Sequence, residues 1–378
     1  MRTPLSSFLL SLVLMGSGWA QVVINEVHYD PEPNIELIEY VELTNAGAEA
    51  VDLTGWSFSS GVQFSFNDGT ILAPGGFLVL TENLSHFETR FGQGADGQFE
   101  GRLTNDGERL EIADAAGVVV DSVNYRSEFP WPIGANGDGV SMELLSPALD
   151  NDLGGSWRSG SELTPGAANS VFVDNAPPQI RQVKHSPKMP ATTEESVISA
   201  KITDPDSVGE VSLVYQVVTP GKYISSHLSK ESSVWKSRPN DPLEENPAFE
   251  DPDNWVTVPM VDDGTGGDAV AGDGTYSITL PAQSSRTIVR YRIRAEDSAG
   301  ASVRVPHADD PSLNFAYFSY DGVPEYVAGD RTVVEGAELP YTHSEEVMQD
   351  SLPVYTLITD EDDFDQCIAY SSADQVGR

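Results

Sequence analysis

Short alternating apolar stretches, separated by turns rich in glycine and asparagine, run from Val22 to Asn169 and constrain the fold more than any other feature. Within residues 39–44, Val41 and Leu43 are two positions apart, so they point to the same side of a strand, which we expect to be the core. Turn signals such as Asn67-Asp68-Gly69 separate the strands, because Asn and Gly tolerate positive φ. Many short strands between such turns predict an all-β sandwich.

The same region carries a series of landmarks in a fixed order. They are Ile24–Pro31 (INEVHYDP), Glu39–Asn45 (EYVELTN), Asp52–Phe58, Leu72–Leu80, Gly107–Ile112, Asp121–Val123, Trp157 and Thr164–Asn169 (TPGAAN). This order resembles the lamin-tail domain, an immunoglobulin-like β-sandwich, in the form found in secreted bacterial proteins. The resemblance implies a module over residues 21–172 that binds or positions a partner. Residues 84–91 predict one helical turn, with Phe87 and Phe91 on one side.

The N-terminus is typical of a secretory signal. Arg2 is followed by an apolar stretch from Phe8 to Met15 and by small residues that end at Ala20. The alternative is an uncleaved membrane anchor, but the apolar stretch is well short of the ~20 residues that cross a bilayer. We therefore expect residues 1–20 to be cleaved and no transmembrane segment to follow. This predicts a bacterial protein that is secreted or held at the cell surface.

The chain is strongly acidic, with 59 acidic and 21 basic side chains and a formal net charge of −38. Nucleic-acid binding depends on Lys and Arg that neutralise phosphates, so this balance makes a nucleic-acid partner unlikely. The acidic residues are interpreted as a solvated, self-repelling surface, with cation binding at some loops as the alternative. Cys367 is the single cysteine, so no intrachain disulfide can form.

A second β pattern follows Pro177-Pro178, which marks a boundary because prolines fix φ and remove backbone donors. Residues 196–203 and 211–217 alternate as two strands. Together with residues 289–300, they resemble a bacterial extracellular immunoglobulin- or fibronectin-like domain, and we place that domain at residues 173–320.

Two details of this second domain follow from its pattern. Tyr291, Ile293 and Ala295 share one side of a strand and are expected to face inward. Residues 222–255 are polar and too long for a hairpin turn, so they predict an elaborated surface loop, which is either functional or mobile.

The C-terminal part predicts a linker at 321–350 and an incomplete α+β segment at 351–378. A strand-like stretch, Leu352–Thr359, runs into the acidic Asp360–Phe364. This resembles the opening of a CotH-like atypical protein kinase domain of spore coats. The resemblance implies that the chain is a fragment of a larger protein, whose nucleotide- and metal-binding residues would follow Arg378.

The chain shows no phosphate-binding loop, zinc-binding HExxH helix or GxSxG nucleophile elbow, so we predict no catalytic residues and no organic cofactor. Cys367 is interpreted as a packed thiol. The histidines are scattered and are interpreted as surface or loop residues; they are His28, His86, His185, His227, His307 and His343.

Four carboxylates in a glycine-rich stretch, Asp262, Asp263, Asp268 and Asp273, are the candidate metal ligands. We favour a set of ordinary turns, because Asp and Gly are the commonest turn formers. A calcium site is the alternative, because calcium prefers several oxygen ligands on a flexible loop.

Glu26 and Glu42 are acidic residues on strands that otherwise carry apolar residues. We expect each to lie on a solvated face or to pair with Arg102 or Arg109, although a functional role is the alternative.

The sequence therefore favours a non-catalytic exported protein whose β-sandwich modules bind an unknown protein or surface polymer. The alternatives are the targeting portion of a CotH-like secreted kinase and an accessory region of an extracellular nuclease.

Overall fold

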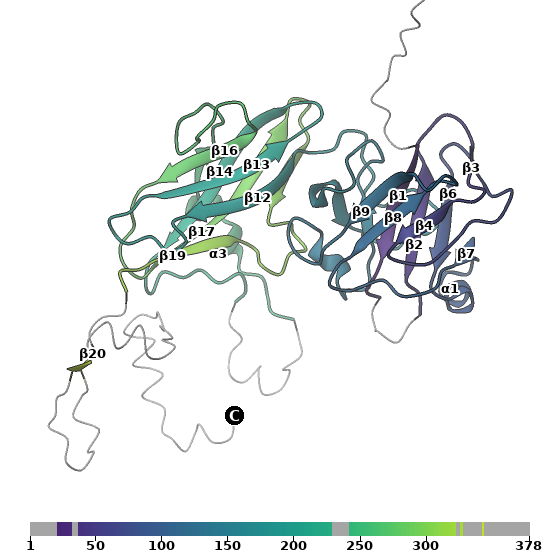
Figure 1. Ribbon diagram of the computed structural model, residues 1–378. Coiled ribbons are helices and arrows are strands. Elements are labelled where there is room, and N and C mark those ends of the chain that lie inside the picture. The colour runs from purple at the N-terminus through teal and green to yellow at the C-terminus, as the bar shows by residue number, and fades with distance from the viewer. Residues whose placement is uncertain (1–20, 32–36, 229–241, 323–325, 328–341, 344–378) are drawn as a thin grey trace, which may run out of the picture. The chain divides into compact units, whose positions relative to one another are not determined.

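The computed structural model describes residues 21–31, 37–228, 242–322, 326–327 and 342–343. The fold is all-β, as predicted, with strands in several sheets and few helices (Figure 1). The chain divides into two compact units: Met1–Ala176 with Asp309–Pro311, and Pro177–Ala308 with Ser312–Arg378. The predicted α+β segment at 351–378, including Cys367, lies outside the described residues.

The first unit is built from short strands and one α-helix. Its strands are β1 (Val22–His28), β2 (Tyr40–Asn45), β3 (Val51–Asp52), β4 (Ser57–Ser60), β5 (Ile71–Leu72), β6 (Phe77–Thr81), β7 (Gly97–Gln98), β8 (Arg109–Ala113), β9 (Val119–Asn124), β10 (Met142–Leu144) and β11 (Trp157–Ser159). Its helices are α1 (Leu84–Phe91) and the 3-10 turns η1 (Ile133–Ala135) and η2 (Gly154–Ser156).

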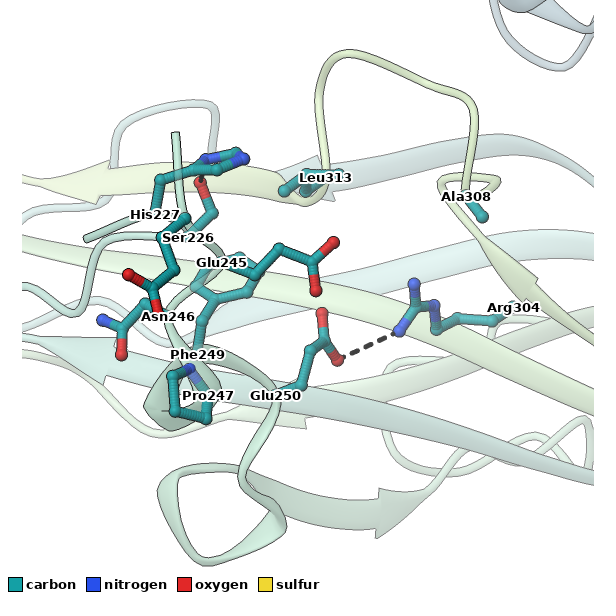
Figure 2. A pocket seen from close by; sticks show the side chains of 11 residues that line it. Ser226, His227, Glu245, Asn246, Pro247, Phe249, Glu250, Arg304, Ala308 and Leu313 are labelled. Atoms are coloured by element: carbon teal, nitrogen blue, oxygen red, sulfur yellow. Dashed lines mark hydrogen bonds and ion pairs between the residues drawn. The ribbon is translucent and has the colours of Figure 1, made fainter. Parts of the chain in front are cut away.

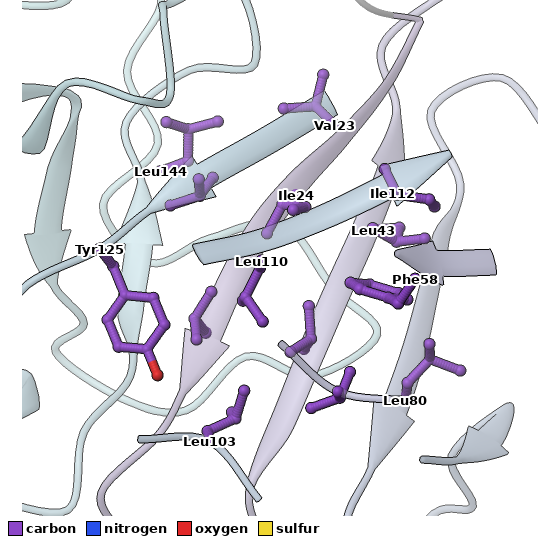
Figure 3. Packing of buried hydrophobic residues seen from close by; sticks show 14 of the residues in the cluster. Val23, Ile24, Leu43, Phe58, Leu80, Leu103, Leu110, Ile112, Tyr125 and Leu144 are labelled. Carbon is purple, nitrogen blue, oxygen red and sulfur yellow. The ribbon is translucent and has the colours of Figure 1, made fainter. Parts of the chain in front are cut away.

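A six-stranded sheet in the order β11-β10-β1-β2-β6-β7 faces a three-stranded sheet in the order β4-β8-β9, and β3 pairs with β5. The core lies between the two larger sheets, where Ile24 and Leu43 pack with Leu110 and Ile112 (Figure 3). Val41 and Leu43 both pack in this core, which confirms the inward side expected from the alternation.

The outer face of the six-stranded sheet is also covered. Helix α1 spans the predicted residues, and its Phe87 and Phe91 rings each meet the Tyr40 ring edge-on at 5.9 Å. Asn83 caps the helix start by accepting a hydrogen bond from His86 N, and Gly92, at φ 68°, ends the helix in the left-handed conformation. All residues of β2 are buried, on both faces.

The second unit is a two-sheet sandwich with a short helical insertion. Its strands are β12 (Gln179–Ser186), β13 (Ser196–Thr203), β14 (Val208–Val218), β15 (Val256–Pro259), β16 (Thr275–Leu280), β17 (Thr287–Asp297), β18 (Ser302–Val305) and β19 (Phe315–Ser319). Its helices are α3 (Pro247–Glu250) and the 3-10 turn η3 (Pro252–Asn254), and two further short strands, β20 (Tyr326–Val327) and β21 (Thr342–His343), pair with each other.

One sheet has the order β12-β13-β16, and the other has the order β15-β14-β17-β18, with β19 also pairing with β17. Strand β13 coincides with the predicted residues 196–203. Tyr291, Ile293 and Ala295 of β17 are buried, which confirms the predicted inward side.

The insertion between β14 and β15 differs from the surface loop that its composition predicts. It forms α3 and η3, and it buries the side chains of Phe249 and Trp255. The polar composition concealed this packing because two aromatic residues are enough to anchor a short insertion.

None of the helices among the described residues has the length and apolar character needed to cross a membrane.

Replacing Leu110 with Ala tests the core of the first unit. Because Leu110 is fully buried, the truncation leaves a cavity, and we expect the free energy of unfolding to fall by about 2–5 kcal/mol in urea titrations. The control Val119→Ala removes a side chain that is 46% exposed and is expected to change it by less than about 1 kcal/mol. Similar losses for the two variants would contradict the core assignment.

Candidate functional site

Three glutamates lie side by side across adjacent strands of the first unit, on the outer face of its six-stranded sheet. Glu26 of β1 is opposite Glu143 of β10 on one side and opposite Glu42 of β2 on the other. All three side chains are fully buried. We call Glu26, Glu42 and Glu143 the carboxylate row.

A bulge in β1 brings an amide to the same place. The pairing register shifts between Ile24 and Glu26, which leaves Asn25 as the extra residue. Its Nδ2 donates to Glu42 Oε1 at 2.9 Å and to Asn169 Oδ1 at 2.8 Å. The bulge therefore adds a donor to the carboxylate row. In a regular strand, the side chain of Asn25 would point to the opposite face.

Residues 161–171, the closing segment, bind the carboxylate row through backbone and side-chain donors. Thr164 donates to Glu26 through Oγ1 at 3.0 Å and through its backbone N at 3.2 Å. Gly166 N donates to Glu42 Oε2 at 2.6 Å, and Ser170 Oγ donates to Glu143 Oε2 at 2.9 Å. Each glutamate thus holds a different point of the closing segment.

Two hydroxyls of the sheet complete the environment of Glu26. Tyr40 Oη donates to Glu26 Oε1, and Ser141 Oγ donates to the same oxygen at 2.5 Å. Buried polar groups cost free energy unless they are hydrogen-bonded, so these donors reduce the cost of burying the carboxyl group.

The row has no basic partner among the ion pairs of the described residues. Burial, together with the neighbouring Glu26, raises the pKa of Glu42 to about 8. Burial likewise raises the pKa of Glu143 to about 7, again with a contribution from Glu26, and it raises the pKa of Glu26 itself. All three carboxyl groups of the row therefore ionise at a higher pH than a solvated glutamate.

The expectation that Glu26 and Glu42 lie on a solvated face or pair with arginine is wrong. Arg102 binds Glu82 at 2.8 Å, and Arg109 binds Glu111 at 2.9 Å. The physical reason is that residues far along the chain cover this face, which strand alternation alone cannot show.

His28 also departs from its interpretation as a surface histidine. It is fully buried, its ring centroid lies 5.2 Å from that of Tyr40 with the two rings tilted by 49°, and its Nδ1 lies 3.3 Å from Ile38 O. Burial lowers the pKa of His28 to about 4, so its imidazole is neutral at pH 7.

In the second unit, three of the four predicted metal ligands come together. Asp262, Asp268 and Asp273 each offer a carboxylate oxygen, and these oxygens lie within 4.8 Å of one another. Asp263 is not part of this group; its Oδ1 accepts from Thr265 N at 3.0 Å and from Thr265 Oγ1 at 2.6 Å.

The grouped carboxylates also close the loop. Asp262 accepts backbone hydrogen bonds from Gly272 N at 2.9 Å and Gly274 N at 2.8 Å. Asp268 Oδ2 accepts from Gly264 N at 2.7 Å. The donor set of carboxylate oxygens suits calcium, while the hydrogen bonds show a structural role for the same groups.

Comparison with known proteins identifies the class of the first unit. The Lamin Tail Domain family matches residues 17–127, so the chain contains a lamin tail domain, an immunoglobulin-like β-sandwich. A search of curated proteins finds no match to the chain.

Glu143 and the closing segment lie beyond the residues matched by the lamin tail family. Sequence reasoning noticed the Thr164–Asn169 motif as a landmark, but the strand pattern gave no sign that it binds Glu26 and Glu42.

The carboxylate row predicts that the first unit loses stability as the pH rises from about 5 to 8. An unfolded glutamate has its ordinary pKa of 4.5, whereas the pKa of Glu42 in the folded chain is about 8. Between these values the unfolded state ionises first, so ionisation favours unfolding. Each pKa unit corresponds to ~1.4 kcal/mol, so urea titrations at several pH values should show a decline of a few kcal/mol.

Glu42→Gln provides the matched variant, because its amide oxygen can still accept from Gly166 N while the ionisation is removed. The decline in stability between pH 5 and pH 8 should shrink. The exposed Glu49→Gln serves as the control and should leave the decline unchanged. Identical pH dependence in Glu42→Gln and the unsubstituted protein would contradict the assignment.

Calcium binding by Asp262, Asp268 and Asp273 predicts a higher midpoint of thermal unfolding for the second unit in calcium than in chelator. A ligand at a hundredfold excess over its Kd stabilises the folded state by about 2.7 kcal/mol. Asp268→Asn should remove the rise, whereas Asp263→Asn, outside the group, should keep it. An unchanged midpoint in calcium would leave these carboxylates with the loop-closing role alone.

Proposed function

We propose that this chain is a non-catalytic exported protein whose β-sandwich modules bind or position a protein or a surface polymer, at the cell surface or outside the cell. The observation that carries the proposal is that the carboxylate row accepts hydrogen bonds from its own chain. Its three glutamates are fully buried, and they bind Thr164, Gly166 and Ser170 of their own chain. This arrangement builds a module and directs no reactive group to solvent.

Export is supported by the position of the first strand. Strand β1 begins at Val22, so cleavage after Ala20 would remove no residue of the sheet. The new N-terminal residue would be Gln21, whose Nε2 donates to Glu49 O at 2.7 Å. A bacterial secretory signal at residues 1–20 is therefore compatible with a complete sheet.

The first alternative is that these modules form the targeting portion of a CotH-like secreted kinase. It rests on the resemblance of Leu352–Phe364 and on the order of the two β-sandwich modules before it. Residues 352–364 lie outside the described part of the chain. Sequencing the gene beyond the codon for Arg378 tests it, because a reading frame that continues into a kinase-like domain is required. A stop codon at that point would remove this alternative.

A role beside an extracellular nuclease is the second alternative, and the net charge of −38 opposes it. Like charges repel the phosphate backbone, so we propose that the chain does not bind DNA. A gel shift at low salt, with single- and double-stranded DNA, would show a complex if the alternative held.

The proposal predicts that the purified chain lacks catalytic activity. Assays of phosphotransfer from ATP and of ester, glycoside and phosphodiester hydrolysis should give background rates. A measured rate above background that is lost in Glu42→Gln would overturn the proposal and reassign the carboxylate row as an active site. Glu49→Gln serves as the exposed control in the same assays.

A further inference from the structure

A cavity of about 590 Å³ opens on the second unit beside the insertion between β14 and β15. Its size lies within the usual range of small-molecule sites, about 300–1,000 Å³. The side chains of Glu245, Glu250 and Arg304 surround the same space, together with the apolar Phe249 and Leu313 (Figure 2).

The wall formed by the insertion is fixed to the sheet. Phe249 and Trp255 cover two buried arginines of β17: the Arg292 guanidinium lies 4.2 Å from the Trp255 ring centroid, and the Arg290 guanidinium lies 4.7 Å from the Phe249 ring centroid. Trp255 Nε1 donates to Phe249 O at 2.7 Å, which ties the two aromatic residues together. Such a wall needs little ordering when a ligand binds.

Backbone hydrogen bonds hold the acidic side of the cavity. Leu228 N donates to Glu244 O at 2.8 Å, and Asn246 N donates to Ser226 O at 2.9 Å. His227 and Glu245 pair as an isolated β-bridge. Glu244 and Glu245 are thus presented from a fixed backbone, although their side chains are exposed.

Among the charged residues around the cavity, some form ion pairs and others do not. Glu250 is bound by Arg292 through two contacts of 2.8 Å and by Arg304 at 3.3 Å. Within the described residues, Glu244 and Glu245 have no ion pair. The cavity therefore offers two unneutralised carboxylates, one guanidinium and an apolar wall.

We propose that this cavity binds an amino sugar residue of a polysaccharide. Ring hydroxyls need both acceptors and donors, which Glu245 and Arg304 supply from the same space. The exposed Pro247 and the half-buried Leu313 line the cavity and suit the C–H face of a sugar ring. The free carboxylates of Glu244 and Glu245 pair with an ammonium group and repel an acidic sugar.

This inference rests on the proposed binding role and names the class of polymer for the second unit. Its failure is distinguishable from failure of the proposed function, because enzymatic activity would overturn the latter whether or not a sugar binds.

The test is calorimetric titration of the chain at low ionic strength with four probes: a glucosamine trimer, maltotriose, a galacturonic acid trimer and cadaverine. We expect the glucosamine trimer to bind with a Kd on the order of millimolar, maltotriose to bind more weakly, and the galacturonic acid trimer not to bind. Cadaverine has amines without hydroxyls and should bind more weakly than the glucosamine trimer.

The double variant Glu244→Gln/Glu245→Gln should weaken binding of the glucosamine trimer about tenfold, because charge-assisted hydrogen bonds are lost. The matched control Glu195→Gln, an exposed glutamate of the same unit outside the cavity, should bind like the unsubstituted chain. Raising the salt concentration should weaken binding without any substitution.

Absent binding of the glucosamine trimer would overturn the proposal. So would equal binding of the galacturonic acid trimer or of cadaverine, equal affinity of the double variant, or affinity that does not depend on salt.

Discussion

Burial of the three glutamates Glu26, Glu42 and Glu143 is the constraint on which the first unit depends. Moving carboxyl groups out of water is unfavourable unless hydrogen-bond donors replace the lost water. The closing segment, residues 161–171, supplies those donors, so a part of the chain far from β1 and β2 is needed to complete their environment. The lamin tail match ends at residue 127, whereas the hydrogen-bonded unit extends past Glu143 to the closing segment.

In the second unit, the covered outer face of a sheet carries basic residues, in contrast to the glutamates of the first unit. Arg290 and Arg292 of β17 are buried under Phe249 and Trp255, and Glu250 binds Arg292. In both units, a connecting segment without regular strands covers polar residues on the outside of a sheet. In the first unit the closing segment covers the buried carboxyl groups and hydrogen-bonds to them. In the second unit the insertion leaves a cavity lined by Glu244 and Glu245, which have no ion pair within the described residues. This difference places the proposed ligand site in the second unit.

Much of the strand pattern was predictable because alternation and turn residues are local. Strand β13, helix α1 and the inward side chains of β17 follow from spacing alone. The burial of Glu26 and His28 was not predictable, because alternation shows that two residues share a face and not what covers that face. The same reason explains why the insertion at 222–255 looked like a surface loop. Its two anchoring aromatic residues meet arginines that are distant in sequence.

The sequence by itself determined the all-β class, the lamin tail pattern, the strong negative charge and the acidic residues available for binding. These properties depend on residue types and on spacing within one strand. Tertiary structure decided which acids are buried with a raised pKa, which are paired and which face a cavity. Glu42, Glu250 and Glu245 are the same residue type, yet one binds its own backbone, one binds arginine and one has no ion pair within the described residues. The physical reason is that the free energy of a carboxyl group depends on the water, donors and charges around it.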